Sequence, residues 1–274
     1  MFYAFFLKEV GPSVRKALVI FSLFSLVVVG CKDDPDPKPV DPGVNPFDTI
    51  TNFTGLIVPS TGSITFSMDY QFNGSPITYS SKNYSSFGGD TFTINNLKHY
   101  LSNITLTKMG GGKVNLGNYH LLDGQHAPST VFTIANVPAG HYTAVEFALG
   151  VDSARNYAGV QEGALDPAWG MFWTWNTGYI FFRINGNTSK GKSYAYDLGG
   201  SEHLVRIGMD LSSYKVKSVQ PKMGFLMDVN ELFQNPDTIN FEKDGPFVHS
   251  NTDEPITKLK ANMKDMVTVK SLTQ

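Results

Sequence analysis

The chain has 274 residues, a formal net charge of −2 and a single cysteine. This balance offers no basic excess for binding nucleic acid, so we expect no nucleic-acid partner. One cysteine cannot form an internal disulfide, so burial must stabilise the fold, and an aromatic content of 13% suits that task.

The first 30 residues are typical of a lipoprotein signal peptide. A positively charged leader with Lys8, Arg15 and Lys16 precedes residues 17–29, an apolar run that ends directly before Cys31. The run is shorter than the roughly 20 residues that cross a bilayer. Because the only cysteine stands at the cut, we predict cleavage before Cys31 and its lipidation. Acyl chains then anchor the protein, at about 0.8 kcal/mol per buried CH₂.

Residues 31–60 are predicted to be the lipidated cysteine and a disordered tether. Residues 32–47 are rich in Asp and Pro, and they carry too few large apolar side chains to offset the entropy of ordering. Lys32-Asp33-Asp34, directly after the cysteine, resembles the surface-export signal of Bacteroidetes lipoproteins. We therefore predict an outer-membrane lipoprotein at the cell surface. A generic acidic tether on a lipoprotein that faces the periplasm stays open as the alternative.

Residues 61–274 alternate apolar and polar side chains as half-buried strands do. In residues 63–70, for example, Ile64, Phe66 and Met68 fall on one face. We predict strands at 63–70, 92–97, 99–108, 114–122, 131–134, 143–149, 179–184, 193–198, 204–211 and 222–229. Turns are indicated at Asn73-Gly74, Gly110-Gly111-Gly112, Pro138-Ala139-Gly140 and Asn185-Gly186-Asn187, and short helices at 166–169, 229–234 and 258–266. The pattern has no repeat or break in composition, so it predicts an all-β fold: a single antiparallel β-sandwich domain with a few short helices.

The most distinctive stretch lies between residues 149 and 184. It includes Leu149-Gly150-Val151-Asp152-Ser153-Ala154-Arg155-Asn156 and Trp173-Thr174-Trp175-Asn176-Thr177-Gly178-Tyr179. Two further segments are Leu97-Lys98-His99-Tyr100-Leu101-Ser102-Asn103-Ile104 and Val137-Pro138-Ala139-Gly140-His141-Tyr142. Over about residues 62–230 the chain resembles the MbnP-like family, which is named for a methanobactin-associated copper-binding protein and is common as lipoproteins in Bacteroidetes.

The resemblance implies a secreted, β-rich protein that holds copper. In characterised relatives a di-haem, peroxidase-like partner enzyme oxidises a tryptophan to kynurenine, which lies beside histidine ligands of Cu(I). Imidazole suits copper, and a site shielded from water favours the reduced ion. By this resemblance the candidate metal site comprises Trp173, Trp175, Asp197, His99 and His203.

The chain departs from the family pattern at two positions. Copper-binding relatives usually carry His-Leu-Gly after the tryptophan segment, whereas this chain has Asp197-Leu198-Gly199. They often have a histidine after the Gly-Val turn, where this chain has Tyr157. Because a carboxylate is a harder ligand than imidazole, Asp197 should weaken Cu(I) binding.

Structural roles compete with each of these assignments. Trp173 and Trp175 would share one face of a strand, where both could simply pack the core. None of the six histidines is spaced as metal-ligand pairs usually are. No nucleophile or general acid/base pair is indicated, so we expect no enzymatic activity. The rival hypothesis is therefore a surface lipoprotein module that binds a glycan or a protein, with purely structural tryptophans.

Overall fold

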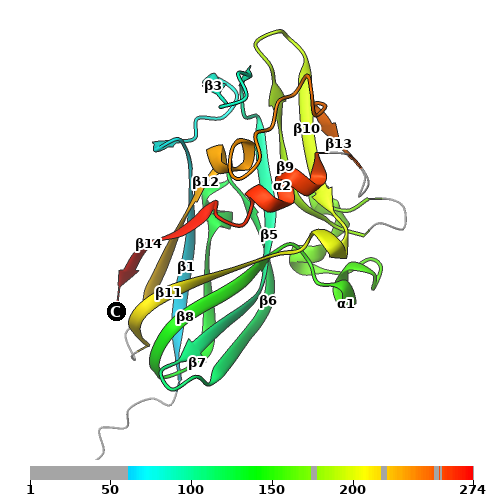
Figure 1. Ribbon diagram of the computed structural model, residues 1–274. Coiled ribbons are helices and arrows are strands. Elements are labelled where there is room, and N and C mark those ends of the chain that lie inside the picture. Colours follow the sequence, from blue (N-terminus) through cyan, green and yellow to red (C-terminus); the bar gives the residue numbers. More distant parts are fainter. Residues whose placement is uncertain (1–60, 174–177, 217–220, 250–252, 254, 274) are drawn as a thin grey trace, which may run out of the picture. The chain divides into compact units, whose positions relative to one another are not determined.

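The structure, a computed structural model, describes residues 61–273 except 174–177, 217–220, 250–252 and 254. The predicted signal peptide, Cys31, the tether and Trp175 lie outside the described residues. Within the described part, no helix is long and apolar enough to cross a membrane. The all-β prediction is confirmed: strands dominate and the helices are short (Figure 1).

The smaller main sheet is built around its first strand. Strand β1 pairs in parallel with β12 along one edge, and with β7 and β2 in antiparallel fashion along the other. Strand β14 then pairs with β12. The members are β1 (Thr61–Phe72), β2 (Ser75–Pro76), β7 (Val131–Pro138), β12 (Lys222–Asp228) and β14 (Val267–Thr273).

The larger sheet is centred on β5. Strand β6 lies along one edge of β5, and β8 and β9 follow each other along its other edge; β11 continues from β8, and β10 and β13 continue from β9. The members are β5 (Asn96–Lys108), β6 (Lys113–Asp123), β8 (Gly140–Leu149), β9 (Ile180–Asn187), β10 (Ser193–Gly199), β11 (Val205–Val216) and β13 (Phe247–Val248). A short ribbon joins β3 (Tyr84–Ser85) and β4 (Thr91–Phe92).

The inner faces of the two sheets form the main core. Phe225 of β12 meets Phe147 of β8 with ring centroids 5.3 Å apart, which joins the sheets across the sandwich. On the smaller sheet, Phe66 stacks on Phe132 at 5.3 Å. Alternation along each strand sends the remaining residues to the outer face, as predicted for a sandwich.

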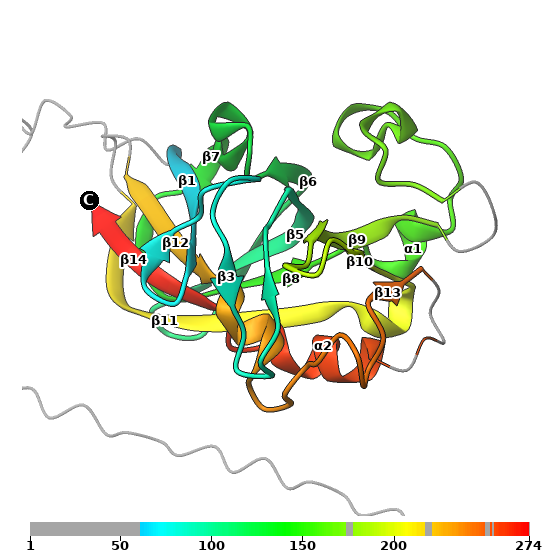
Figure 2. The ribbon, with the colours of Figure 1, turned by 90° about the horizontal axis from the view of Figure 1, so that it is seen from above.

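A second, smaller core covers the outer face of the larger sheet. It joins Tyr100 of β5 with Met171, Trp173 and Tyr179, which belong to the segment between β8 and β9. That segment carries α1 (Ser153–Asn156) and lies beside β9 and β10 in both views (Figures 1 and 2). The other α-helix is α2 (Ile256–Asn262).

Three details differ from the sequence prediction. The sheets are mixed, because β1–β12 and β10–β13 are parallel pairs between strands far apart in the chain. Strand β14, after α2, was not predicted. The predicted turn at Asn185-Gly186-Asn187 is wrong, since these residues continue β9. A Cβ on Gly186 would overlap the carbonyl oxygen of Thr93, so this glycine permits a close backbone approach and not a turn.

Candidate functional site

Two of the predicted site residues, Trp173 and His203, lie against Gly199, at the end of β10 on the outer face of the larger sheet. The six-membered ring of Trp173 lies directly over Gly199, where an added Cβ would overlap it. His203 follows in a 3-10 turn, and its Nδ1 is 2.8 Å from the carbonyl oxygen of Gly199. Asp197, two residues before Gly199, lies on the same side of the strand. These side chains are nearly buried, with exposed fractions of 8% for Trp173, 6% for Asp197 and 9% for His203.

Both carboxylate oxygens of Asp197 are bound by Arg183. The two residues are direct cross-strand partners on β10 and β9. The guanidinium donates from Nε to Oδ1 and from Nη2 to Oδ2, each at 2.7 Å. This two-pronged geometry is the strongest form of an arginine–carboxylate pair. The remaining Nη1 donates to the carbonyl oxygen of Gly170 at 2.8 Å, which ties the pair to the segment that carries Trp173.

A row of ionisable side chains crosses the outer face of the sheet through this pair. The strand register places Asp123 of β6 opposite Lys98 of β5, and Lys98 opposite Arg183 of β9. The Nζ atom of Lys98 is 3.2 Å from Asp123 Oδ2, so each cation has its own carboxylate. At the far end, Nδ1 of His249 is 3.9 Å from Asp197 Oδ2. The row therefore runs in the order Asp123, Lys98, Arg183, Asp197, His249. Within it, the charge of each cation is balanced by that of its paired carboxylate.

His99 lies on the opposite face of the sheet from Trp173. Its side chain is fully buried in the main core, where Nε2 is 2.9 Å from the hydroxyl of Tyr70 and the ring stacks on Phe182. A sheet thus separates His99 from Trp173 and Asp197. The structure does not bring this imidazole to the predicted site. Burial lowers the pKa of His99 from 6.5 to about 4, so the ring is neutral in the folded protein.

The neutral buried ring predicts a loss of stability in mild acid. The unfolded chain takes up a proton on His99 below about pH 6.5, whereas the folded protein does so only below about pH 4. Unfolding free energy should therefore fall as pH drops from about 6.5 to 4, by up to about 3 kcal/mol from this residue. His120, whose pKa burial also lowers to about 4, adds to the same window.

Urea titrations across this pH range measure the effect. His99→Phe should flatten the slope relative to wild type, although it leaves the Tyr70 hydroxyl without its partner. His141→Gln, at an exposed position, is the matched control and should keep the full slope. An unchanged slope in His99→Phe would show that the ring is already protonated or accessible when folded.

The tryptophan segment is not the strand that the sequence suggested. Trp173 is not in a strand; it follows an isolated bridge between Phe172 and Tyr179, and its backbone N–H donates to the carbonyl oxygen of Gly178 at 3.0 Å. Trp175 lies outside the described residues. Tyr157, where relatives often have histidine, has an exposed fraction of 58% and ends α1.

The sequence pattern did not indicate Arg183 or His249 as site residues. Arg183 is a lone charge within the apolar run of residues 179–184, and a carboxylate partner on the next strand was the available signal. His249 follows β13, a two-residue strand that pairs in parallel with β10. The local sequence pattern does not indicate this pairing.

The donor set of this cluster does not fit Cu(I) as it stands. Within the described residues, no three His, Cys, Asp or Glu side chains are grouped closely enough to hold a metal ion. Asp197 is a hard ligand with both oxygens engaged, and the adjacent guanidinium repels a cation. Among the residues that the resemblance suggested, His203 has the expected character, because its Nδ1 contact with a backbone carbonyl leaves Nε2 to act as a ligand.

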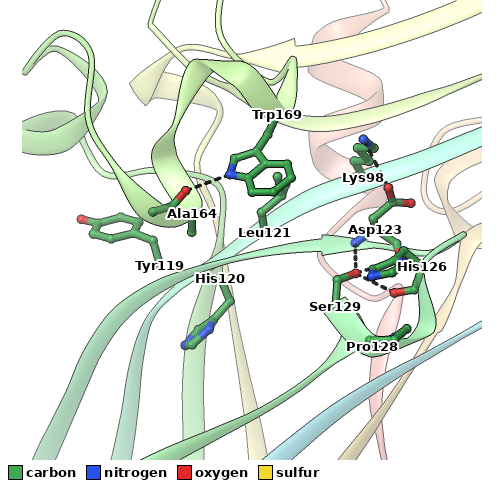
Figure 3. A pocket seen from close by; sticks show the side chains of 11 residues that line it. Lys98, Tyr119, His120, Leu121, Asp123, His126, Pro128, Ser129, Ala164 and Trp169 are labelled. Carbon is green, nitrogen blue, oxygen red and sulfur yellow. Dashed lines mark hydrogen bonds and ion pairs between the residues drawn. The ribbon is translucent and has the colours of Figure 1, made fainter.

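A separate pocket of about 640 Å³ lies beside Trp169 (Figure 3). Trp169 and Leu121 form an apolar wall, and Lys98, Asp123 and His126 line the side facing it. The indole Nε1 of Trp169 donates to the carbonyl oxygen of Gly163 at 2.8 Å. Because Lys98 and Asp123 belong to the charged row, the pocket and the Trp173 cluster share one sheet face.

Comparisons with known proteins agree with this architecture. A profile of the MbnP family matches residues 61–252. Among solved structures, MbnP from Methylosinus trichosporium superposes with a TM-score of 0.50 at 14% identity, covering 77% of this chain and 99% of that one, which shows a shared fold. A comparison with curated proteins gave no match.

Proposed function

The chain belongs to the MbnP family, and from this we propose that it is an exported binding protein, anchored in the outer membrane through Cys31 and exposed at the cell surface. The family is one of binding proteins, so we propose that the protein binds its ligand and does not catalyse a reaction. The signal pattern ending in Val28-Val29-Gly30-Cys31 supports export and anchoring. Lys32-Asp33-Asp34 supports the surface location.

We propose that the Trp173 cluster is the place of the family's copper site and that it binds Cu(I) only weakly in this chain. The observation that carries this proposal is the bidentate pair between Arg183 and Asp197, at the position where relatives supply an imidazole. His203 would remain as a ligand, and Trp173 would shield the ion from water. The site would bind Cu(I) without catalysing a reaction. The roles of His203 and Trp173 would be to bind the ion and to exclude water from it.

Restoring an imidazole should therefore raise the affinity for copper. Asp197→His supplies a softer ligand, and combining it with Arg183→Met removes the neighbouring cation. We expect the double variant to bind Cu(I) at least about tenfold more tightly than wild type, which corresponds to about 1.4 kcal/mol. A competition titration with a chromogenic Cu(I) chelator measures the difference, with circular dichroism to verify folding.

Two controls define the result. His203→Ala in the double variant should abolish the gain if this imidazole is a ligand, whereas His126→Ala, in the separate pocket, should leave the gain intact. Tight stoichiometric binding by wild type would contradict the proposed weakness. Equal Cu(I) affinities in wild type and the double variant would show that this cluster is not the copper site. That result would favour the glycan- or protein-binding module.

The proposed partner is a di-haem, peroxidase-like enzyme that modifies a tryptophan. Intact mass and elemental analysis of protein purified from its native host examine kynurenine formation and copper content in one sample. A mass equal to that of the unmodified lipidated chain would argue against such a partner.

A further inference from the structure

The pocket beside Trp169 is built for a ligand that is apolar on one face and hydroxylated at its edge. Its volume of about 640 Å³ is within the roughly 300–1,000 Å³ that is usual for small-molecule sites. It lies outside the Trp173 cluster and contains none of the proposed copper ligands. Its chemistry must therefore be considered separately.

Trp169 offers only its ring faces to a ligand. Its exposed fraction is 55%, which is large for an indole, and its single polar atom is already bound to Gly163. More than half of its surface is therefore accessible. A large aromatic surface left open above a pocket is a usual mark of a binding site.

The indole is also held in place before any ligand arrives. Asp166 Oδ1 accepts from the backbone N–H of Ala168 at 2.8 Å, which caps the 3-10 turn containing Trp169. Gly170, in the left-handed conformation that glycine adopts easily, ends that turn, and Arg183 binds its carbonyl oxygen. A side chain fixed in this way loses little freedom on binding, so more of the contact energy appears as affinity.

The polar wall is close to neutral in charge. Lys98 and Asp123 are paired at 3.2 Å, and each keeps part of its surface exposed, with side-chain fractions of 22% and 23%. The Asp123 carboxylate would repel an anionic ligand, and the Lys98 ammonium would repel a cationic one. A hydroxyl group can both accept from the ammonium and donate to the carboxylate, so neighbouring hydroxyls satisfy both groups at once.

We propose that this pocket binds a pyranose sugar, with the C–H face of the ring stacked on Trp169 and its hydroxyls bonded to Lys98 and Asp123. The C–H bonds of a pyranose face are weakly positive and suit the negative face of an indole. A flat aromatic ligand would stack equally well but would bring no hydroxyl groups to the Lys98–Asp123 pair. His126, which also lines the pocket, supplies a further polar contact at its edge.

Isothermal titration of the detergent-solubilised full chain tests the proposal. The probes are cellobiose, maltose, lactose and N,N′-diacetylchitobiose, which together vary linkage and hydroxyl configuration. At least one should bind, and Trp169→Ala should weaken that binding at least tenfold while Trp169→Phe retains part of it. Lys98→Met should also weaken binding, because it removes one hydroxyl partner.

The matched control is Phe87→Ala, which removes an aromatic side chain with an exposed fraction of 77% that does not line this pocket. It should bind the sugar as wild type does, and so should Asp197→His, which alters only the Trp173 cluster. Failure of all four disaccharides to bind overturns the proposal, as does binding that survives Trp169→Ala. Neither outcome bears on copper, so the two proposals fail separately.

Discussion

Gly199→Ala should destabilise the protein by about 3 kcal/mol, at the upper end of what overpacking usually causes. The new methyl group would overlap the ring of Trp173 and stand 2.5 Å from the carbonyl oxygen of Tyr179. The ring could move only by leaving the outer core, and the carbonyl belongs to backbone at the start of β9. Neither the Trp173 ring nor the Tyr179 carbonyl can therefore move at a low cost in free energy. The Trp173 cluster would be displaced even if the fold survived.

Urea unfolding followed by far-ultraviolet circular dichroism measures this loss. Gly208→Ala is the matched control, because the same change in β11 places a methyl group with nothing within 4 Å. That variant should be as stable as wild type or slightly more stable, since alanine restricts the unfolded chain. Equal midpoints for the two variants would mean that Trp173 does not rest on Gly199.

Cys31→Ser should release the protein from membranes completely. Removing the thiol removes the acylation site. Several acyl chains at about 0.8 kcal/mol per buried CH₂ account for stable retention, so their loss should move the protein from the membrane pellet to the soluble fraction. Cell fractionation and immunoblotting measure the distribution.

Replacing Lys32-Asp33-Asp34 by three alanines is the companion experiment. This variant keeps Cys31 and should still sediment with membranes, but it should lose accessibility to protease added to intact cells. Retention of Cys31→Ser at the wild-type level would refute the lipid anchor. Full surface accessibility of the alanine variant would refute the export signal and favour an orientation that does not depend on these residues.

The charged row couples position 197 to Arg183. A carboxylate at position 197 stands opposite Arg183, and a buried pair of this kind costs about 3–5 kcal/mol when only one partner is removed. Asp197 and Arg183 are thus best changed together, which is why the copper experiment uses the double variant. The same coupling ties the pair to Gly170 and so to the segment that positions both Trp169 and Trp173.

Local pattern was enough to predict most of the long strands and the fold class. The alternation of Ile64, Phe66 and Met68 identifies β1 because burial on one face of a strand repeats every second residue. The short helices at 166–169 and 229–234 were likewise confirmed, within a residue or so, by turns at Pro167–Trp169 and Val229–Phe233. The family resemblance suggested Trp173, Asp197 and His203 together, and in the structure Trp173 and His203 both lie against Gly199 while Asp197 precedes it on β10.

Only the tertiary structure decided which face each side chain uses and what lies opposite it. His99 and Trp173 both seemed suited to one site, yet the register of β5 turns His99 into the sandwich while Trp173 covers the outer face. Gly186 resembled a turn residue because its sequence neighbours are turn formers, whereas its actual constraint is the distant carbonyl of Thr93. The pairs of Asp197 with Arg183 and His249 depend on the order and register of β9, β10 and β13. Strand pairing between distant segments is set by the packing of the whole sheet, and so the sequence by itself determined the elements and the tertiary structure determined the site.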